Sequence, residues 1–259
     1  MIFVIPLRSE KTSSNWNNVC ERLEATINSI LKQKDCSDDI HIIICGHEEP
    51  DFLENNDNQN IVFLEAPFSS PVNTSEYMAD KLNKKRFAGT YVKEELLSND
   101  TNQLLMQLDA DDILHPNFVS NISLLFSEDD TIDDVMIMDG YAFDYSRKEL
   151  AYLDGINKIF YRNCGSSFIS KLSSEDLGSD ITSKCYFNEL TNHVKYPEIS
   201  VTYGRKVRGC YFPGVMYLVN HGSNDASERH GVQKIQNFVD QFRAEVCEHP
   251  MAITLIKSI

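Results

Sequence analysis

Short apolar runs alternate with segments of helical periodicity through residues 1–140, and this order is compatible with few folds. The apolar runs Ile2–Pro6 and Ile40–Cys45 each predict a buried strand. Between them, apolar residues recur at the spacing of one helix face: Val19, Leu23, Ile27, Ile30 and Leu31. Strand, helix and strand in this order form a βαβ unit, which builds a parallel sheet with helices on its faces.

A second crossover follows, from a predicted strand at Ile61–Leu64 through a helical segment near Tyr77–Leu97 to a buried strand at Leu104–Leu108. That strand runs directly into Asp109-Ala110-Asp111-Asp112, and the next helix is predicted to reach Phe126. In open α/β sheets, ligands bind outside the carboxyl ends of the strands. The acidic segment is therefore expected at a ligand site.

The alternation weakens after a predicted strand at Val135–Met138. Tyr141–Leu153 fits a hairpin, Tyr186–Lys195 fits a short helix, and two strands are predicted around Pro213-Gly214. A last amphipathic helix is predicted from the apolar positions Val232, Ile235, Val239, Phe242 and Val246. Because there is no internal repeat or linker, we expect a single α/β domain over residues 1–259.

Composition limits the partners and the compartment. The chain has 259 residues, 42% of them hydrophobic, and a net charge of -15, which opposes binding to DNA or RNA. The seven cysteines form no CxxC pair and predict free thiols. No apolar stretch fits a signal peptide or an integral membrane segment, so we expect a cytoplasmic protein.

Asp109 and Asp111 carry the strongest chemical signal. Alternate residues leaving a strand point the same way, so two carboxylates at this spacing can share a hard divalent cation. Such a cation can offset the charge of a diphosphate, and the basic residues Lys81, Lys84 and Lys85 add positive charge. The alternatives are that the acidic triplet is loop and helix-capping material, and that Lys84 and Lys85 form a solvated helix face.

The segment Gln107-Leu108-Asp109-Ala110-Asp111-Asp112, followed by Pro116 and a helix, resembles the DxD turn of GT-A glycosyltransferases, particularly the bacterial family-2-like ones. Three further segments match: Val4-Ile5-Pro6-Leu7-Arg8, Asp80-Lys81 with Lys84-Lys85-Arg86, and His221-Gly222-Ser223-Asn224. The resemblance covers most of residues 1–140. It implies a Rossmann-like mixed sheet flanked by helices, with a nucleotide-sugar half (1–140) and an acceptor half with a closing segment (141–259).

The resemblance implies that Asp111 ligates a Mn²⁺ or Mg²⁺ that bridges the diphosphate of a nucleotide-sugar. Asp109 would lie near the ribose or reach the metal through water, with Ala110 beside the nucleotide. Asp112 would support the metal ligands or cap a helix. His221 would complete the metal shell, although a lone histidine is more often structural.

The remaining nucleotide contacts are expected from strand ends and one helix: Pro6, Leu7, Arg8, His47, Glu48, Asp80 and Lys81. For His47 an ordinary loop position is the alternative. The loop Gly222–Ser227 is expected to close over the diphosphate, with Asn224 or Ser227 donating hydrogen bonds.

The catalytic base is harder to predict, because the acidic ED pair of family-2-like enzymes is not clearly present. Glu189 is the nearest candidate, and His193, four residues later, would share its helix face and orient it or act itself. Exposed surface positions are the alternative for both. Asp139 is a further candidate for contacting a sugar, and Gly165-Ser166-Ser167 lines a pocket or forms a turn.

We therefore expect a metal-dependent hexosyltransferase in polysaccharide or surface-glycan synthesis. It would move a sugar from a nucleotide-linked donor, expected to be a UDP-sugar, to a glycan or lipid-linked acceptor with inversion; peripheral contact with the inner membrane stays open. One alternative is a sugar-phosphate nucleotidyltransferase, although Pro6-Leu7-Arg8-Ser9 lacks the glycines of its usual phosphate loop. The other is a non-catalytic nucleotide- or glycan-binding relative.

Overall fold

The computed structural model describes residues 1–259 except 35–39, 55, 98–101, 158–159, 224–227 and 229. Its strands form two mixed sheets. The seven strands of the large sheet are, in spatial order, β10 (Val207–Cys210), β6 (Asp134–Ile137), β9 (Phe168–Leu172), β4 (Gln103–Gln107), β1 (Ile2–Pro6), β2 (His41–Gly46) and β3 (Ile61–Glu65). The five strands of the small sheet are β12 (Arg243–Ala244), β8 (Glu149–Leu153), β7 (Gly140–Asp144), β11 (Val215–Val219) and β5 (Ile113–Leu114).

The longer helical elements are α1 (Trp16–Leu31), α2 (Tyr77–Tyr91) with its π-helical extension η3 (Val92–Leu96), α3 (Phe118–Glu128), α6 (Tyr196–Thr202), α8 (Val232–Gln241) and α9 (Pro250–Ile256). The short ones are η1 (Glu10–Thr12), η2 (Thr74–Glu76), α4 (Phe160–Asn163), η4 (Ser174–Asp176), α5 (Tyr186–Glu189), η5 (His193–Lys195) and η6 (Val246–Glu248).

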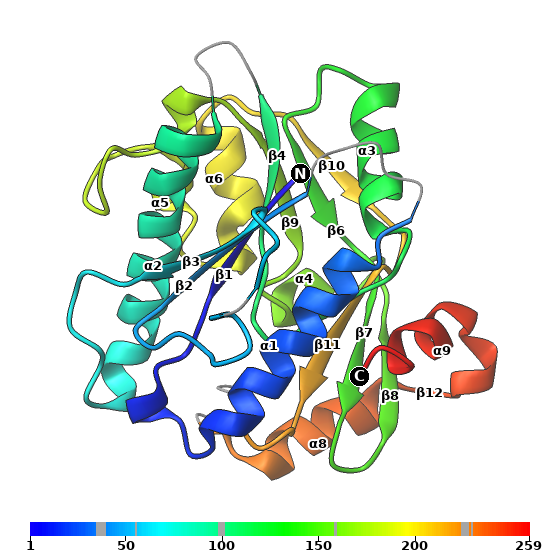
Figure 1. The fold of residues 1–259 in the computed structure, drawn as a ribbon. Coiled ribbons are helices and arrows are strands. Elements are labelled where there is room, and N and C mark those ends of the chain that lie inside the picture. The colour runs from blue at the N-terminus through cyan, green and yellow to red at the C-terminus, as the bar shows by residue number, and fades with distance from the viewer. Residues whose placement is uncertain (35–39, 55, 98–101, 158–159, 224–227, 229) are drawn as a thin grey trace.

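Helices cover both faces of the large sheet (Figure 1). Along β1, Phe3 and Ile5 point to one face and belong to an apolar cluster that also contains side chains of α1, α3 and α8. Ile2 and Val4 point to the other face, where α2, α5 and α6 supply the partners. Strand β1 is thus buried on both sides, which explains its uninterrupted apolar sequence.

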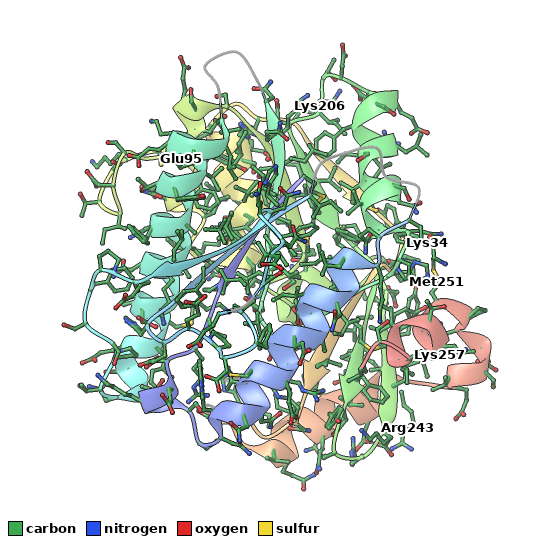
Figure 2. The ribbon with its side chains drawn as sticks, viewed as in Figure 1. Lys34, Glu95, Lys206, Arg243, Met251 and Lys257 are labelled. Carbon is green, nitrogen blue, oxygen red and sulfur yellow. The ribbon has the colours of Figure 1, made fainter. Side chains whose placement is uncertain are left out.

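The small sheet lies beside this layered body and is covered by α9. Ala252 and Leu255 of α9 are buried against β7, β8 and β11. Figure 2 shows Met251 and Lys257, at the two ends of this helical segment, on the outer edge of the molecule. Within the described ranges, no helix has both the length and the apolar character of a membrane span.

The order of the strands reverses beside β1. Strand β1 pairs in parallel with β2 on one side and with β4 on the other, through Ile2↔His41 and Ile2↔Leu105. The chain therefore leaves β1 in one direction and returns from β3 to β4 in the other. Ligands of open α/β sheets bind at such a switch point, outside the carboxyl ends of the strands. In this protein, that position lies between the segments that follow Pro6 and Gln107.

Residues after 140 complete the large sheet. Strand β9 lies between β4 and β6 and is antiparallel to both, with Met106↔Ile169 and Met136↔Phe168 as partners. Strand β10 then extends the sheet in parallel with β6. Strand β9 was not predicted from the sequence.

Two predicted helices are wrong in extent. Tyr186–Lys195 is not one helix, because α5 ends at Glu189 and η5 begins only at His193. The last amphipathic helix ends at Gln241, so Phe242 and Val246 lie beyond it. The predicted hairpin over Tyr141–Leu153 is confirmed by the antiparallel pairing of β7 and β8.

Candidate functional site

A pocket opens at the carboxyl ends of β1 and β4, where the strand order reverses. The β1–α1 segment, α1, α2, the turn after β4 and the segment after β11 line it. Its lining includes ten of the residues singled out from the sequence for nucleotide, metal or charge: Pro6, Leu7, Arg8, Asp80, Lys81, Lys84, Asp109, Ala110, Asp111 and His221. The fold thus gathers residues from both halves of the chain.

His221, from the segment after β11, is in direct contact with the acidic turn after β4. Its Nε2 atom lies 2.8 Å from Oδ2 of Asp111, and the hydroxyl of Ser223 lies 3.2 Å from its Nδ1. The preceding residue, Asn220, adopts a left-handed conformation (φ 55°) that few residues other than glycine tolerate. The Asn220 amide donates a 2.8 Å hydrogen bond to buried Asp144, and this bond stabilises the sharp turn that brings His221 to Asp111.

Asp109 is held by cations from α2. Nζ of Lys81 lies 2.7 Å from Asp109 Oδ1, and Nζ of Lys85 lies 4.0 Å from the same oxygen. Burial alone would raise the pKa of Asp109, but Lys81 and Lys85 outweigh burial and lower its pKa to about 2. The backbone N–H of Asp109 donates to the hydroxyl of Ser166 at 2.8 Å. A Cβ on Gly165 would lie 3.0 Å from Asp109 Oδ2, so the absent side chain makes room for this carboxylate.

Lys84 and Lys85 are buried, with 1% and 6% of their surfaces exposed, so the interpretation of a solvated helix face is wrong. Burial lowers the pKa of both amines, that of Lys85 to about 8. Lys84 donates to the Leu7 carbonyl at 2.8 Å and to Oδ2 of Asp80 at 2.7 Å. His47 lies 2.7 Å from the other Asp80 oxygen, so this chain of contacts ties α2 to the ends of β1 and β2.

Arg8 and Glu48 fix the segment after β1. The Arg8 guanidinium pairs with both carboxylate oxygens of Glu228, at 2.8 and 2.7 Å, and lies 5.0 Å from the Tyr77 ring. Glu48 accepts hydrogen bonds from the Ser9 hydroxyl and the backbone N–H of Glu10. In this structure Glu48 therefore supports the loop, whereas Arg8 lines the pocket.

Asp112 points away from the pocket into the interior. It is fully buried, and the Cys164 thiol donates to its Oδ2 at 3.4 Å. Burial raises the pKa of Asp112 well above its usual range, and Asp111 and Asp109 add to this effect by charge repulsion. Asp112 therefore favours its neutral form more than an exposed aspartate does.

The three candidate catalytic residues occupy different environments. Nδ1 of His193 lies 2.6 Å from the Tyr161 carbonyl; burial lowers the pKa of His193, and Asp109 partly counteracts this effect. Glu189 is exposed at the end of α5. Asp139 accepts a 2.7 Å hydrogen bond from the Tyr152 hydroxyl and one from a backbone N–H, so both of its oxygens stabilise the β7–β8 region.

Several site residues were not identified from the sequence. Arg22 and Tyr77 line the pocket. Burial raises the pKa of Tyr217, and the nearby Asp111 and Asp112 raise it further. Arg22 left a usable signal, because it is a charge within the apolar face of α1. Asn224 and Ser227, which were expected to contact a diphosphate, lie outside the described residues.

The residues that the structure describes contain no group of three or more His, Cys, Asp or Glu side chains arranged to hold a metal ion. Asp111 and His221, which are in contact and both line the pocket, form a pair of potential ligands. A complete coordination shell would need further ligands from a bound molecule or from water.

No protein-family model and no curated protein matches this sequence. Solved structures match it at low identity. TarS residues 1–349 from S. aureus, in complex with UDP-GlcNAc, align with a TM-score of 0.51 and 9% identity over 87% of this chain and 60% of that chain. The same protein in complex with UDP aligns with a TM-score of 0.49 and 11% identity, over 84% of this chain and 60% of that chain. The mannosyltransferase PcManGT from Pyrobaculum calidifontis, in complex with GDP-Man and Mn²⁺, aligns with a TM-score of 0.44 and 12% identity, over 85% of this chain and 56% of that chain.

This chain thus spans less than two thirds of the length of these matched chains. The alignment with the UDP-GlcNAc complex of TarS covers both halves of the present chain. It confirms the fold class predicted from the sequence: the chain has an α/β fold of the GT-A type.

Proposed function

We propose that this protein is a glycosyltransferase that takes a sugar from a nucleotide-sugar, with a UDP-sugar as the expected donor. The observation that carries the proposal is the contact of His221 with Asp111 beside the Lys81–Asp109 ion pair, at the switch point of a GT-A-type fold. This arrangement puts carboxylates, a histidine and lysines around one pocket, which suits a diphosphate bound together with a cation.

The pocket provides separate surroundings for the two ends of a nucleotide. Pro6, Leu7 and Tyr77 supply apolar and aromatic surface for a base or ribose. Lys81 and Asp111 lie on the side where a diphosphate would meet both a cation and a metal ligand. We assign Asp80 and His47 to the support of this wall, because their contacts join α2 to the strand ends.

A divalent cation is part of the proposal, with Asp111 and His221 as the protein ligands. The fit is good, because one carboxylate and one imidazole leave several positions for phosphate oxygens and water. An imidazole ligand favours Mn²⁺ over Mg²⁺, which prefers oxygen. When bound, such an ion offsets the charge of the departing diphosphate.

His193 is our candidate for the base that takes the proton from the acceptor hydroxyl. A carbonyl oxygen can only accept, so the 2.6 Å contact with Tyr161 places the proton of neutral His193 on Nδ1. Nε2 then carries the lone pair that a base needs. Burial favours the neutral ring at pH 7 by lowering the pKa of His193. Glu189 is less suited, because it is exposed on a helix that ends before His193.

Residues 141–259 are proposed to provide the acceptor half, and Asp139, which follows β6, contacts this half through Tyr152 and Gly155. The proposed reaction is direct displacement at the anomeric carbon with inversion, and the proposed context is polysaccharide or surface-glycan synthesis. An acceptor that is lipid-linked would be met at the surface of the membrane.

Calorimetric titration with UDP, with and without Mn²⁺, is the first test, followed by assays for UDP release from a panel of UDP-sugars and acceptors. Metal-dependent binding with turnover would support the proposal. Pyrophosphate release from a nucleoside triphosphate and a sugar phosphate would instead support a nucleotidyltransferase. Metal-dependent binding without turnover of any donor would favour a non-catalytic relative.

A further inference from the structure

Arg22 is an unusual residue of α1, because it is charged, buried and part of the pocket wall. It lies on the helix face that carries Val19 and Leu23, and 10% of its side chain is exposed. Arg22 and Val19 line the same pocket as Asp111, His221 and Ser223. Burying a charged group without hydrogen-bond partners is costly, so a site that removes a guanidinium from solvent usually supplies them.

Two of the Arg22 donors, Nε and Nη1, are buried. Neither donates to any acceptor among the residues that the structure describes. Nη2 of Arg22 lies 3.9 Å from Glu21, a mainly exposed side chain. Donors of a buried guanidinium that remain unpaired in the protein are available to a ligand in the adjoining pocket.

The plane of the Arg22 guanidinium is constrained by an aromatic ring. Its central carbon lies 4.6 Å from the centre of the Tyr145 ring, a distance typical of a cation–π contact. Tyr145 is itself fixed, because its backbone N–H donates to the Val219 carbonyl at 2.9 Å. Arg22 is thus held against the segment that leads to His221.

The other cations of the pocket are paired with carboxylates. Lys81 contacts Asp109, Lys84 contacts Asp80, and Arg8 binds Glu228. Each of these ion pairs offsets a charge of the protein itself. Arg22 differs because its only carboxylate contact in the described structure is the long one to Glu21.

We infer that Arg22 binds an oxyanion of the ligand on the α1 side of the pocket, and this inference rests on the proposed nucleotide-sugar site. The two adjacent donors of an arginine match two oxygens of a phosphate or carboxylate. The diphosphate is the expected source, because Arg22 lines the same pocket as the metal-ligand pair Asp111 and His221. A carboxylate on an acidic donor sugar is the other source of the same chemistry.

The test compares wild type, R22Q and R22K by calorimetry with uridine, UDP, UDP-glucose and UDP-glucuronate, all with Mn²⁺. Loss of charge-assisted hydrogen bonds predicts about 10- to 100-fold weaker binding of UDP to R22Q, with R22K in between and uridine unchanged. An equal loss for every phosphate-bearing ligand identifies the diphosphate. A loss confined to UDP-glucuronate identifies the sugar carboxylate.

The matched control is E21Q, which removes the long ion pair of Arg22 and should leave all affinities within about twofold of wild type. Unchanged binding of every ligand by R22Q would overturn the inference. So would an equal loss of uridine binding, which would mean that Arg22 only supports the pocket. If R22Q does not fold, R22K provides the same comparison with smaller losses.

Inorganic pyrophosphate with Mn²⁺ separates this inference from the proposed function. If wild type binds no nucleotide, the proposed function fails, and weaker pyrophosphate binding by R22Q would still support an oxyanion site at Arg22. If wild type binds neither a nucleotide nor pyrophosphate, both proposals fail.

Discussion

Nε2 of His221 lies 2.8 Å from Oδ2 of Asp111, although 110 residues separate them in the sequence. The contact joins the turn after β4 to the segment after β11, so one wall of the pocket comes from each half of the chain. Two potential ligands from segments so far apart in the sequence can coordinate one ion only if both segments keep their positions.

Replacing His221 with alanine is expected to weaken Mn²⁺-dependent UDP binding by about 10- to 100-fold, in the range for loss of a group that supports or ligates a metal. Asp111→Asn should weaken Mn²⁺-dependent UDP binding at least as much, because it removes the negative charge of the proposed metal ligand. Calorimetric titration with UDP and Mn²⁺ measures both losses of affinity. The control is the binding of uridine in the absence of metal. Full Mn²⁺-dependent binding by both variants would contradict the assigned ligands.

UDP binding is expected to weaken as the pH rises through about 8. Burial lowers the pKa of Lys85 to about 8, so its positive charge is present at pH 7 and is lost above that value. Linkage limits the loss to about tenfold per pH unit for one proton. Titrations with Mg²⁺ between about pH 7 and pH 9 measure the effect. The K85M variant should bind UDP more weakly than wild type at pH 7, and its affinity for UDP should no longer fall as the pH rises through about 8. If the affinity of K85M falls with pH as that of wild type does, Lys85 is not the group that titrates.

A methyl group at position 165 should disturb the site more than the fold. The Cβ of Gly165→Ala would lie 3.0 Å from Oδ2 of Asp109, and this carboxylate is also held by Lys81. We expect severalfold to about tenfold weaker UDP binding, the scale of a small misplacement. Gly209→Ala is the control, because its nearest neighbour is the flexible Met138 side chain at 3.1 Å. Equal affinities of both variants would show that Asp109 adjusts freely.

His193→Gln is expected to lower kcat by about 100-fold or more while leaving the Kd for UDP unchanged, as for removal of a general base. Because burial lowers the pKa of His193, the neutral base should persist below pH 6.5, and the wild-type rate should fall only at lower pH. Steady-state rates measured over a range of acidic pH values test where the rate begins to fall. Glu189→Gln should retain wild-type rates; loss of activity in that variant alone would transfer the role to Glu189.

Asp134→Ala is expected to destabilise the fold by up to about 3–5 kcal/mol, because it removes the fully buried one of the two carboxylates that pair with Arg205, the other being Asp176. Arg205 binds both oxygens of Asp134, at 3.0 and 3.2 Å, and Asp134 is fully buried. Urea unfolding measures the loss. Glu128→Gln removes an exposed pair with Arg208 and should change stability by less than about 1 kcal/mol. Equal effects of the two substitutions would contradict this reasoning.

Local patterns were sufficient to predict the strands that surround the switch point. Ile2–Pro6 and His41–Gly46 are buried on both faces, so their apolar runs are continuous and easily recognised. The acidic turn was recognisable because it directly follows such a strand. His221 was identified only through the resemblance, since nothing local indicates that residues 111 and 221 meet.

The remaining features depend on contacts that no local pattern records. Strand β9 contains Ser170 and Lys171, and its position between β4 and β6 is set by pairing with strands distant in the sequence. The predicted common helix face of Glu189 and His193 failed because α5 ends after one turn. The proposed role of Arg22 in binding an oxyanion depends on which of its donors lack partners among the described residues, and only the three-dimensional packing shows this.

The position of β9 also has a consequence during translation. Strand β4 cannot gain its neighbour on that side until residues through Leu172 have left the ribosome. Until then the nascent chain carries an unpaired strand edge, which is a site for wrong pairing with other chains. The pocket at the ends of β1 and β4 therefore forms late in synthesis, although most of its residues are translated early.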